Sequence, residues 1–327
     1  MLRYVLRRMA NYVVLLVLAV TGVYFLAASS LNARSVYAQR QPPVNPEVLD
    51  NMLYRWNLND KTPIVERYWI WLKGVVLHWD WGVTPLGASV NVDVATKMWV
   101  SLRLILIGTL AGVVVGVLIG AWTATRQYKI SDRVVTALSL VIICTPAFVL
   151  GLASQILAIH INRWTGTSFF QFVGETGKYG SYPGAYWVMR LQHILLPTVV
   201  LMLMEAAFLS RIQRNLMLDA LGEDYVRTAR AKGLPKSKAV MRHALRTALI
   251  PTGTYVAFTV ATMFVGATYT ETVFSFAGMG SYLVTSIGTM NVNGVVAVTA
   301  FTGVCIVAGA ILSNIVVAIL DPRVRLG

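Results

Sequence analysis

The chain has 327 residues, of which 56% are hydrophobic and only 13% are charged, and its mean hydropathy is +0.63. Because an average soluble domain is about 25% charged, this composition indicates a membrane protein and excludes an ordinary water-soluble globule. The net charge of +14 at pH 7 raises the question of whether the protein binds nucleic acid. No basic stripe with interleaved aromatic residues occurs in a polar segment, so the sequence predicts no nucleic-acid partner.

Six apolar stretches approach or exceed the roughly 20 residues that a helix needs to cross a bilayer. They cover approximately residues 9–29, 99–122, 134–159, 191–210, 251–271 and 295–320. Backbone groups find no water in the hydrocarbon core, so each stretch is expected to be helical. The sequence therefore predicts an all-α, polytopic membrane protein in which residues 1–327 form a single transmembrane domain with six transmembrane helices.

The first apolar stretch is predicted to remain as a membrane anchor. A cleaved signal peptide is the alternative, with Arg7 and Arg8 as its charged region. A signal core is typically about 7–15 residues long, whereas this run continues from Met9 to about Ser29. Most of the 28 Lys and Arg residues fall in segments that are cytoplasmic if the N-terminus is cytoplasmic. The positive-inside rule thus predicts a multi-pass protein with both termini in the cytoplasm.

The extracytoplasmic segment 30–98 is too long and too rich in Trp and Tyr to be a bare linker, so we expect it to fold. Apolar residues recur near helical spacing from Pro63 to Val75, which predicts an amphipathic helix near the membrane surface. Its aromatic residues have two interpretations, an interfacial belt or a platform for a soluble partner. The second outer loop, 160–190, contains five glycines and is expected to be the least structured segment.

A third outer segment joins the last two apolar stretches, and it begins Glu271-Thr-Val-Phe-Ser-Phe-Ala-Gly-Met-Gly-Ser281. Its glycines predict a turn. Residues 282–287 fit either a short re-entrant helix that constricts the outer end of a pathway or a plain loop. Four residues of this segment are candidates for a translocation pathway, namely Glu271, Phe276, Gly278 and Met279.

Glu205 is the one carboxylate predicted well inside a span, where an ionised group costs at least about 2.5–3.5 kcal/mol on insertion scales. Two interpretations stay open for it. Glu205 lines a water-filled cavity, or it is a protonated or hydrogen-bonded structural residue. Gln155 and Asn314 are weaker pathway candidates, because interhelical hydrogen bonds are the favoured explanation of such residues.

The longest cytoplasmic segment, 211–250, is polar and basic, and it predicts two helices. The first covers 224–233 and has Asp224 in its first turn, basic residues in its last turn and Gly233 at its end. The second begins after Pro235 and runs to Leu249, and Pro251 then opens the next apolar stretch. A long, ordered, basic segment between two spans is typical of a surface that binds a partner.

No motif for chemistry occurs in the chain. The pattern of a nucleotide-binding P-loop is absent, since Gly177-Lys178 is followed by Tyr179 and lacks the first glycine. The four histidines have no carboxylate or cysteine at metal-binding spacing, and Cys144 and Cys305 are expected to be packing residues. We therefore predict no catalytic residue, no metal site and no cofactor bound by this chain, which is not expected to be an enzyme by itself.

The cytoplasmic segment carries a family resemblance. The strings Ser210-Arg-Ile-Gln-Arg-Asn-Leu-Met-Leu-Asp219, Asp224-Tyr-Val-Arg-Thr-Ala-Arg-Ala-Lys-Gly233 and His243-Ala-Leu-Arg resemble the EAA loop of the permease subunits of dipeptide, oligopeptide and nickel ABC importers. Other matching pieces occur in the same order, namely Met1-Leu-Arg-Tyr-Val-Leu-Arg-Arg8, Leu58, Pro63, Arg67-Tyr68, Trp79-Asp-Trp-Gly82, Thr145-Pro146 and Glu271-Thr-Val-Phe-Ser275 with Gly278 and Gly280. The resemblance spans nearly the whole chain, and its order is similar to that of the first of two permease subunits.

The chain also departs from the family pattern. Arg227-Thr-Ala229 stands where the broad pattern has Glu-Ala-Ala, which suits the peptide branch. Ser30-Leu-Asn-Ala-Arg34 replaces a frequent Pro-Gly-Asp-Pro, Ala277 a common proline and Trp79 a common glycine. Glu205 belongs to no motif of the family. These differences leave oligopeptides, dipeptides, glutathione and nickel open as substrates.

The resemblance implies the permease fold of a type I ABC importer, in the cytoplasmic (inner) membrane. It implies four kinds of partner, namely a homologous second permease subunit, ATP-binding cassette ATPase subunits, an extracytoplasmic substrate-binding protein and a peptide substrate. ATP and Mg would be bound by the ATPase subunits. The 224–233 helix would be the coupling helix, and its residues are Asp224, Tyr225, Arg227, Thr228, Ala229, Arg230, Lys232 and Gly233.

Each of these coupling residues has an implied role. Asp224 and Tyr225 would start and seat the helix, the three basic residues would meet the ATPase surface, Ala229 would permit close approach, and Gly233 would supply the turn. The alternative function is a proton-coupled secondary transporter with Glu205 as the proton carrier. That alternative lacks the expected inverted repeat and leaves the segment 219–246 unexplained.

Overall fold

The computed structural model describes residues 2–38 and 40–320, and within these ranges the side chains of residues 2–8, 254, 257, 258, 260–266 and 313–320 are not described. The described chain is helical, and its β contact is an isolated antiparallel bridge between Val83 and Ser89. It forms two compact units. The first unit comprises Leu2–Leu102 with Ala277–Val307, and the second comprises Arg103–Phe276 with the chain from Ala308 on.

The first unit contains three N-terminal helices and a 3-10 turn, namely α1 (Leu2–Ser30), η1 (Ala33–Tyr37), α2 (Pro46–Arg55) and α3 (Ile64–His78). It also contains α11 (Met279–Gly288) and the first parts of α4 (Val90–Ala124) and α12 (Val292–Leu320). Residues 282–287 are therefore helical, so the plain-loop interpretation of this stretch is wrong. The amphipathic helix expected after Pro63 is α3.

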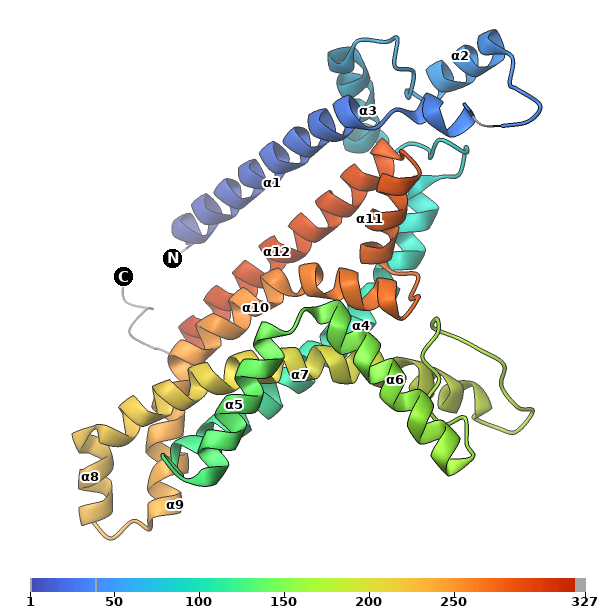
Figure 1. Ribbon diagram of the computed structural model, residues 1–327. Coiled ribbons are helices and arrows are strands. Elements are labelled where there is room, and N and C mark those ends of the chain that lie inside the picture. Colours follow the sequence, from blue (N-terminus) through green and yellow to red (C-terminus); the bar gives the residue numbers. More distant parts are fainter. Residues whose placement is uncertain (1, 39, 321–327) are drawn as a thin grey trace. The chain divides into compact units, whose positions relative to one another are not determined.

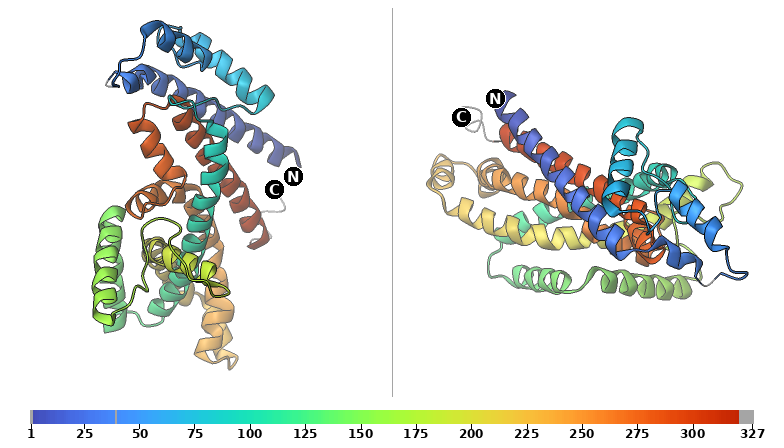
Figure 2. Two further views of the ribbon diagram at one scale, coloured as in Figure 1. Left: turned by 90° about the vertical axis from the view of Figure 1, so that its right-hand side faces the viewer. Right: turned by 90° about the horizontal axis from the view of Figure 1, so that it is seen from above.

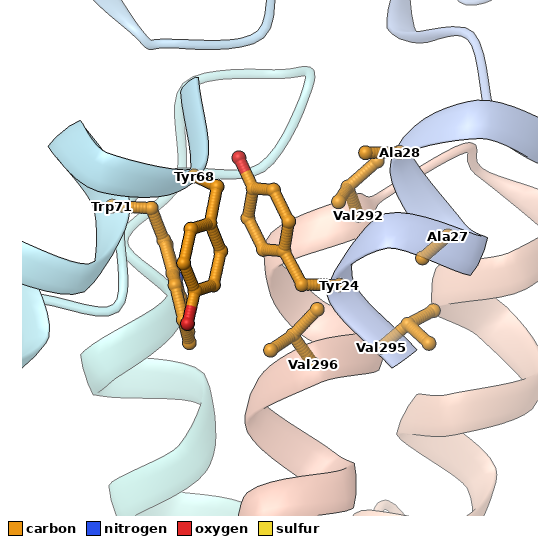
Figure 3. Close-up of a cluster of buried hydrophobic side chains, with 8 residues drawn as sticks. All are labelled: Tyr24, Ala27, Ala28, Tyr68, Trp71, Val292, Val295 and Val296. Carbon is orange, nitrogen blue, oxygen red and sulfur yellow. The ribbon is translucent and has the colours of Figure 1, made fainter. Parts of the chain in front are cut away.

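An aromatic cluster joins α1, α3 and α12 in the first unit (Figure 3). The Tyr24 ring packs against those of Tyr68 and Trp71, with centroid separations of 5.3 and 5.0 Å, and the Tyr68 and Trp71 rings are themselves 6.1 Å apart. The hydroxyl groups of Thr21 and Tyr68 form a hydrogen bond of 2.8 Å. Tyr68 and Trp71 are buried, whereas Trp69 on the same helix is 54% exposed. The aromatic residues of α3 thus divide between the core and an exposed face.

The segment after α1 folds around a second small core in which η1 packs on α2. Arg34 forms ion pairs with Asp50 at 2.6 Å and with Asp60 at 2.8 Å. The hydrogen bond from Arg34 lowers the pKa of Asp60 below its usual range, because it favours the charged carboxylate. Buried leucines such as Leu53 and these polar contacts give the segment 30–98 regular structure.

The second unit is built around α7 (Ala185–Gly222). Around it lie α5 (Ile130–Cys144), α6 (Ala147–Thr165) and α10 (Leu245–Val273), each in contact with α7. The helices α8 (Asp224–Ala231) and α9 (Lys236–Ala239) form a hairpin between the ends of α7 and α10 (Figure 1, Figure 2).

A repeat of four glycines brings α4 against α7, and we call it the glycine stripe: Gly108, Gly112, Gly116 and Gly120. Residues four apart lie on one face of a helix. A Cβ atom added at Gly108 would lie 2.8 Å from the Cβ of Leu201, and one added at Gly112 would lie 2.6 Å from the Cβ of Glu205. Only glycine permits this approach, as in membrane helix pairs that use small residues at four-residue spacing.

The predicted third span, 134–159, is wrong as a single continuous helix. The chain breaks between α5 and α6, and the two helices meet at an angle of 110°. Thr145 has an extended backbone with ψ 125°, as expected before Pro146, because the proline ring disfavours the helical conformation of the preceding residue. The two helices together are long and apolar enough for one span, but that span would be bent at the break.

Four helices of the described chain are long and apolar enough to cross a membrane, with α5 and α6 as a bent fifth candidate. The four are α1, α4, α7 and α12. The predicted stretch 251–271 lies in α10, several of whose side chains are outside the described residues. The number of six transmembrane helices and the single transmembrane domain stay predictions.

The expected start of a new segment at Pro251 is also wrong. A π-helical turn, η2 (Val240–Ala244), joins α9 to α10, and α10 continues through Pro251. Beyond the proline, the Thr252 hydroxyl hydrogen bonds to the Ala248 carbonyl at 2.7 Å and to Gln213 of α7. Membrane helices tolerate an internal proline where side chains and neighbouring helices compensate the backbone in this way.

The glycine stripe makes a direct prediction for stability. Gly112→Ala places a methyl group against Glu205 and the Met202 carbonyl, so we expect overpacking to destabilise the protein by about 1–3 kcal/mol. The measurement is the thermal unfolding of the purified protein in detergent. Gly222→Ala is the matched control, because no atom lies within 4 Å of a Cβ added there. Equal unfolding temperatures for the two variants would contradict the close approach.

Candidate functional site

The hairpin of α8 and α9 begins where α7 ends. Glu223 has an extended backbone, and its carbonyl accepts hydrogen bonds from the amides of Val226 and Arg227 at 3.1 and 3.4 Å. Asp224 follows in the first turn, where the helix dipole interacts favourably with a carboxylate. The helix thus begins at the residue that the sequence predicts.

The end of α8 falls at Ala231, two residues before the predicted end. Lys232 leaves the helical conformation, and Gly233 has φ +89°, a left-handed conformation that favours glycine. The Leu234 amide donates to the Ala229 carbonyl at 3.2 Å, which satisfies one of the last carbonyls of the helix. No atom lies within 4 Å of a Cβ added at Gly233, so its backbone conformation is the constraint.

One residue of α8 attaches the helix to the rest of the unit. Val226 is 3% exposed and packs in a cluster with Met217 of α7 and with Ala239 and Val240. Tyr225, the residue expected to seat the helix, is 39% exposed. Sequence reasoning missed Val226, although it is the one residue of α8 with a branched aliphatic side chain.

The predicted coupling residues form the outer side of α8 and the turn that follows it. All are exposed except Ala229, which is half-buried. Arg227 and Asp224 are 3.7 Å apart, but both side chains are largely exposed, so this ion pair contributes little to stability. The basic groups of Arg227, Arg230 and Lys232 are therefore accessible to a partner. In this hairpin, α8 is held in place through Val226 and presents basic side chains to its exposed side.

An ion pair absent from the sequence prediction supports this end of α7. Arg214 binds Asp132 through two bonds, from Nε to Oδ1 at 2.6 Å and from Nη2 to Oδ2 at 2.8 Å. Asp132 lies in the first turn of α5, is buried, and also accepts from the Tyr128 amide at 2.9 Å. A bidentate Arg–carboxylate pair fixes geometry, so it ties α5 to α7 beside the hairpin.

Glu205 lies on α7 against the glycine stripe. Thr259 of α10 hydrogen bonds to its carboxyl group, and its Oε1 is buried with no hydrogen-bond partner among the described residues. Thr198 Oγ1 and Gln213 Nε2 are also buried with no hydrogen-bond partner among the described residues. The three residues are seven and eight positions apart, which places them along one face of α7. The sequence signal of this polar face is the spacing of the three polar residues along α7, which is not apparent when Glu205 is considered alone.

The other predicted pathway residues do not gather at Glu205. Gln155 donates to the Val273 carbonyl at 2.9 Å, which is the interhelical hydrogen bond that the sequence favours. Glu271 and Phe276 are buried in the second unit, where the Phe276 amide donates to the Glu271 carbonyl at 2.8 Å. In the first unit, Met279 is buried and its amide donates to Ser101 Oγ at 2.7 Å.

Two pathway candidates remain. Gly278 precedes α11 with an extended backbone, φ −95° and ψ −174°. The side chain of Asn314 lies outside the described residues. The assignment of a pathway to these residues stays a prediction. Among the described residues, no group of three or more His, Cys, Asp or Glu side chains is arranged to hold a metal ion.

Comparison with known proteins matches residues 116–326 to the family described as binding-protein-dependent transport system inner membrane component. The oligopeptide transport system permease protein OppB of Mycobacterium tuberculosis (strain ATCC 25618 / H37Rv) is 42% identical over 328 residues, which cover 99% of each chain. The oligopeptide transport system permease protein AppB of Bacillus subtilis (strain 168) is 27% identical over 328 residues, covering 99% of this chain and all of that one.

A third relative carries a different substrate name. The dipeptide transport system permease protein DppB of Bacillus subtilis (strain 168) is 29% identical over 285 residues, which cover 86% of this chain and 85% of that protein. The matched family region contains α5 to α10, and with them the hairpin, Glu205 and the Asp132–Arg214 pair.

Glu205 is the residue of this site whose role is tested most simply. If its charge lines a water-filled pathway, Glu205→Gln and Glu205→Ala each lower uptake at least about fivefold in the assembled transporter, the lower end of typical coupling between sites. The measurement is uptake of labelled substrate across a range of pH. Thr299→Val on α12 is the control, since it removes a hydroxyl that donates to the Val295 carbonyl of its own helix and is not part of the polar face of α7, so it is expected to leave uptake unchanged. Unchanged uptake in both Glu205 variants at every pH would sink the pathway role.

Proposed function

Because this chain belongs to the family of binding-protein-dependent transport system inner membrane components, we propose that it is the permease subunit of an ATP-binding cassette importer for peptides. It is a transport component rather than an enzyme. The observation that carries the proposal is the α8 hairpin, a basic helix held at the junction of two long helices. ATP hydrolysis would occur in separate subunits that dock on this hairpin.

The local geometry fits a coupling element. Val226 fixes α8 to the cluster that contains Met217 of α7 and Val240 of η2, so a force on α8 acts on α7 and α10 together. Arg227, Arg230 and Lys232 point outward for an acidic or polar groove on the partner. ATP biases the inward-facing and outward-facing states only if these contacts differ between them.

The proposal includes the partners and the location. A second, homologous permease subunit would complete the pathway, two ATPase subunits would bind ATP and Mg, and an extracytoplasmic binding protein would deliver the peptide. Relatives named for oligopeptides align with nearly the whole chain, which supports oligopeptides before dipeptides. The protein would lie in the cytoplasmic membrane with both termini and the hairpin on the cytoplasmic side, as its basic residues favour.

A proton-coupled secondary transporter is the second candidate, and Glu205 is the observation that favours it. Its Oε1 is buried and lacks a partner among the described residues, as expected of a group that binds and releases a proton. Glu205 also packs against the glycine stripe, and this contact favours a structural role for Glu205 instead of proton transfer. The basic hairpin has no role in this alternative.

Charge reversal on the hairpin tests the coupling proposal. In Arg227→Glu with Gly233→Asp, the first change reverses an outward charge and the second forces a side chain into φ +89°. We expect the purified complex either to lose its ATPase subunits or to lose at least about tenfold of its substrate-stimulated ATPase activity.

A matched control lies at the end of α6. Arg163→Glu with Gly166→Asp makes the same charge change beside a glycine of φ +64° that also has no atom within 4 Å of an added Cβ. This control is expected to assemble and hydrolyse ATP like the wild type. Normal assembly and normal stimulated ATPase activity in the hairpin variant would rule out the coupling role of α8.

A further inference from the structure

A groove of about 890 Å³ lies in the second unit, between the end of α4 and the chain from α9 through η2 to α10. We call it the α4–α10 groove. Its walls are mainly apolar and include Leu118 and Ala121 on one side and Val240 and Leu245 on the other. This volume falls within the range of about 300–1,000 Å³ that is common for small-molecule sites. Val240 also belongs to the cluster that fixes α8, whereas the polar face of α7 contributes none of the described residues that line the groove.

Three basic residues also line the groove, namely Arg126, Lys129 and Lys236. They come from the turn after α4 and from the first residue of α9, two segments more than 100 positions apart in the chain. The Arg126 guanidinium lies 4.4 Å from the centroid of the Trp122 ring, a cation–π contact that holds it beside the groove. None of the described residues that line the groove is acidic. The groove therefore favours a ligand that is anionic at one end.

The position of the groove along α4 defines the other end of this ligand. The apolar part of α4 continues to Ala124, and the polar turn that carries Arg126 and Lys129 follows directly. Leu118 is 58% exposed and Trp122 is 40% exposed, so apolar surface is open beside the basic residues. Tryptophan is enriched where hydrocarbon meets headgroups. The groove thus passes from an apolar wall to a cluster of positive charge at the boundary of a membrane-spanning helix.

We propose that the α4–α10 groove binds one anionic phospholipid, with its phosphate among Arg126, Lys129 and Lys236 and an acyl chain along the apolar wall. Basic pockets between transmembrane helices bind anionic headgroups in this way. A free phosphate ion leaves the apolar wall without a ligand. A helix of a second subunit covers the wall, and it offers a counter-charge to the three basic residues only if it carries acidic residues of its own. The lipid satisfies both parts of the groove, and it would brace η2, which adjoins the hairpin, against α4.

Lipid binding is measured on the purified transporter complex by native mass spectrometry. The complex is titrated with phosphatidylglycerol, with phosphatidylcholine of the same acyl chains, and with glycerol 3-phosphate, which is the headgroup portion alone. We expect preferential binding of phosphatidylglycerol to one site. Replacing all three basic residues, in R126Q/K129Q/K236Q, is expected to weaken that binding at least about tenfold, since each basic residue near a membrane surface adds attraction for an anionic lipid.

The control removes the same charge from exposed positions outside the groove, in R133Q/K238Q/R242Q, and is expected to bind phosphatidylglycerol like the wild type. A second variant, Ser237→Trp, fills the groove from an exposed lining position and is expected to reduce binding while the basic residues remain. Matching thermal unfolding shows that each variant is folded. This experiment measures binding alone, so it does not depend on the proposed transport function.

Four outcomes would overturn the proposal. The first is equal binding of phosphatidylglycerol by the groove variant and the control variant, and the second is equal binding of phosphatidylglycerol and phosphatidylcholine. Competition by glycerol 3-phosphate at the same concentration as the lipid would identify a phosphate site instead. Efficient crosslinking of a Met241→Cys variant, changed on the groove wall, to a second subunit despite added lipid would identify a subunit interface.

Discussion

The close contact between α4 and α7 is the constraint on which the second unit depends. Four glycines at four-residue intervals allow the two backbones to approach until a Cβ atom added at Gly120 would lie 2.5 Å from the Ser210 carbonyl. In a bilayer, burial of apolar surface provides little drive for helix pairing, so packing at close range and hydrogen bonds must supply it. The contact also places Glu205 where its carboxyl group is enclosed. The feature that holds the helices together therefore positions the polar face of α7.

The same helix connects this contact to the cytoplasmic hairpin. On the C-terminal side of Glu205, α7 hydrogen bonds to α10 through Gln213 and Thr252. Arg214 of α7 is paired with Asp132 of α5. Met217 then packs on Val226 of α8. These contacts make α7 a continuous connection between the interior polar groups and the basic surface. A partner that moves α8 would move α7 with it, and the α4–α10 groove lies beside the π-helical turn η2 that joins α9 to α10.

Features with local causes were predictable from the sequence. The start of α8 follows from Asp224, and Gly233 marks its end to within two residues. The helix α3 follows from helical spacing of apolar residues after Pro63. The bend at Pro146 was not predicted, because hydropathy over 134–159 measures apolar length and ignores the backbone restriction before proline. The glycine stripe is visible as a four-residue repeat, but its partner helix is about 90 residues away. The Asp132–Arg214 pair and the burial of Val226 likewise depend on tertiary contacts that no local pattern encodes.

The central claim is that ATP hydrolysis on a separate subunit, transmitted through the α8 hairpin, drives uptake. The most direct measurement is uptake of a labelled oligopeptide by the complete complex in proteoliposomes, with its binding protein outside. ATP is supplied on the ATPase side or withheld, and a proton gradient is imposed or abolished with a protonophore. The account predicts uptake whenever ATP is hydrolysed, with or without the gradient, and none with a non-hydrolysable analogue. Uptake that follows the proton gradient without ATP would contradict it and would favour Glu205 as a proton carrier.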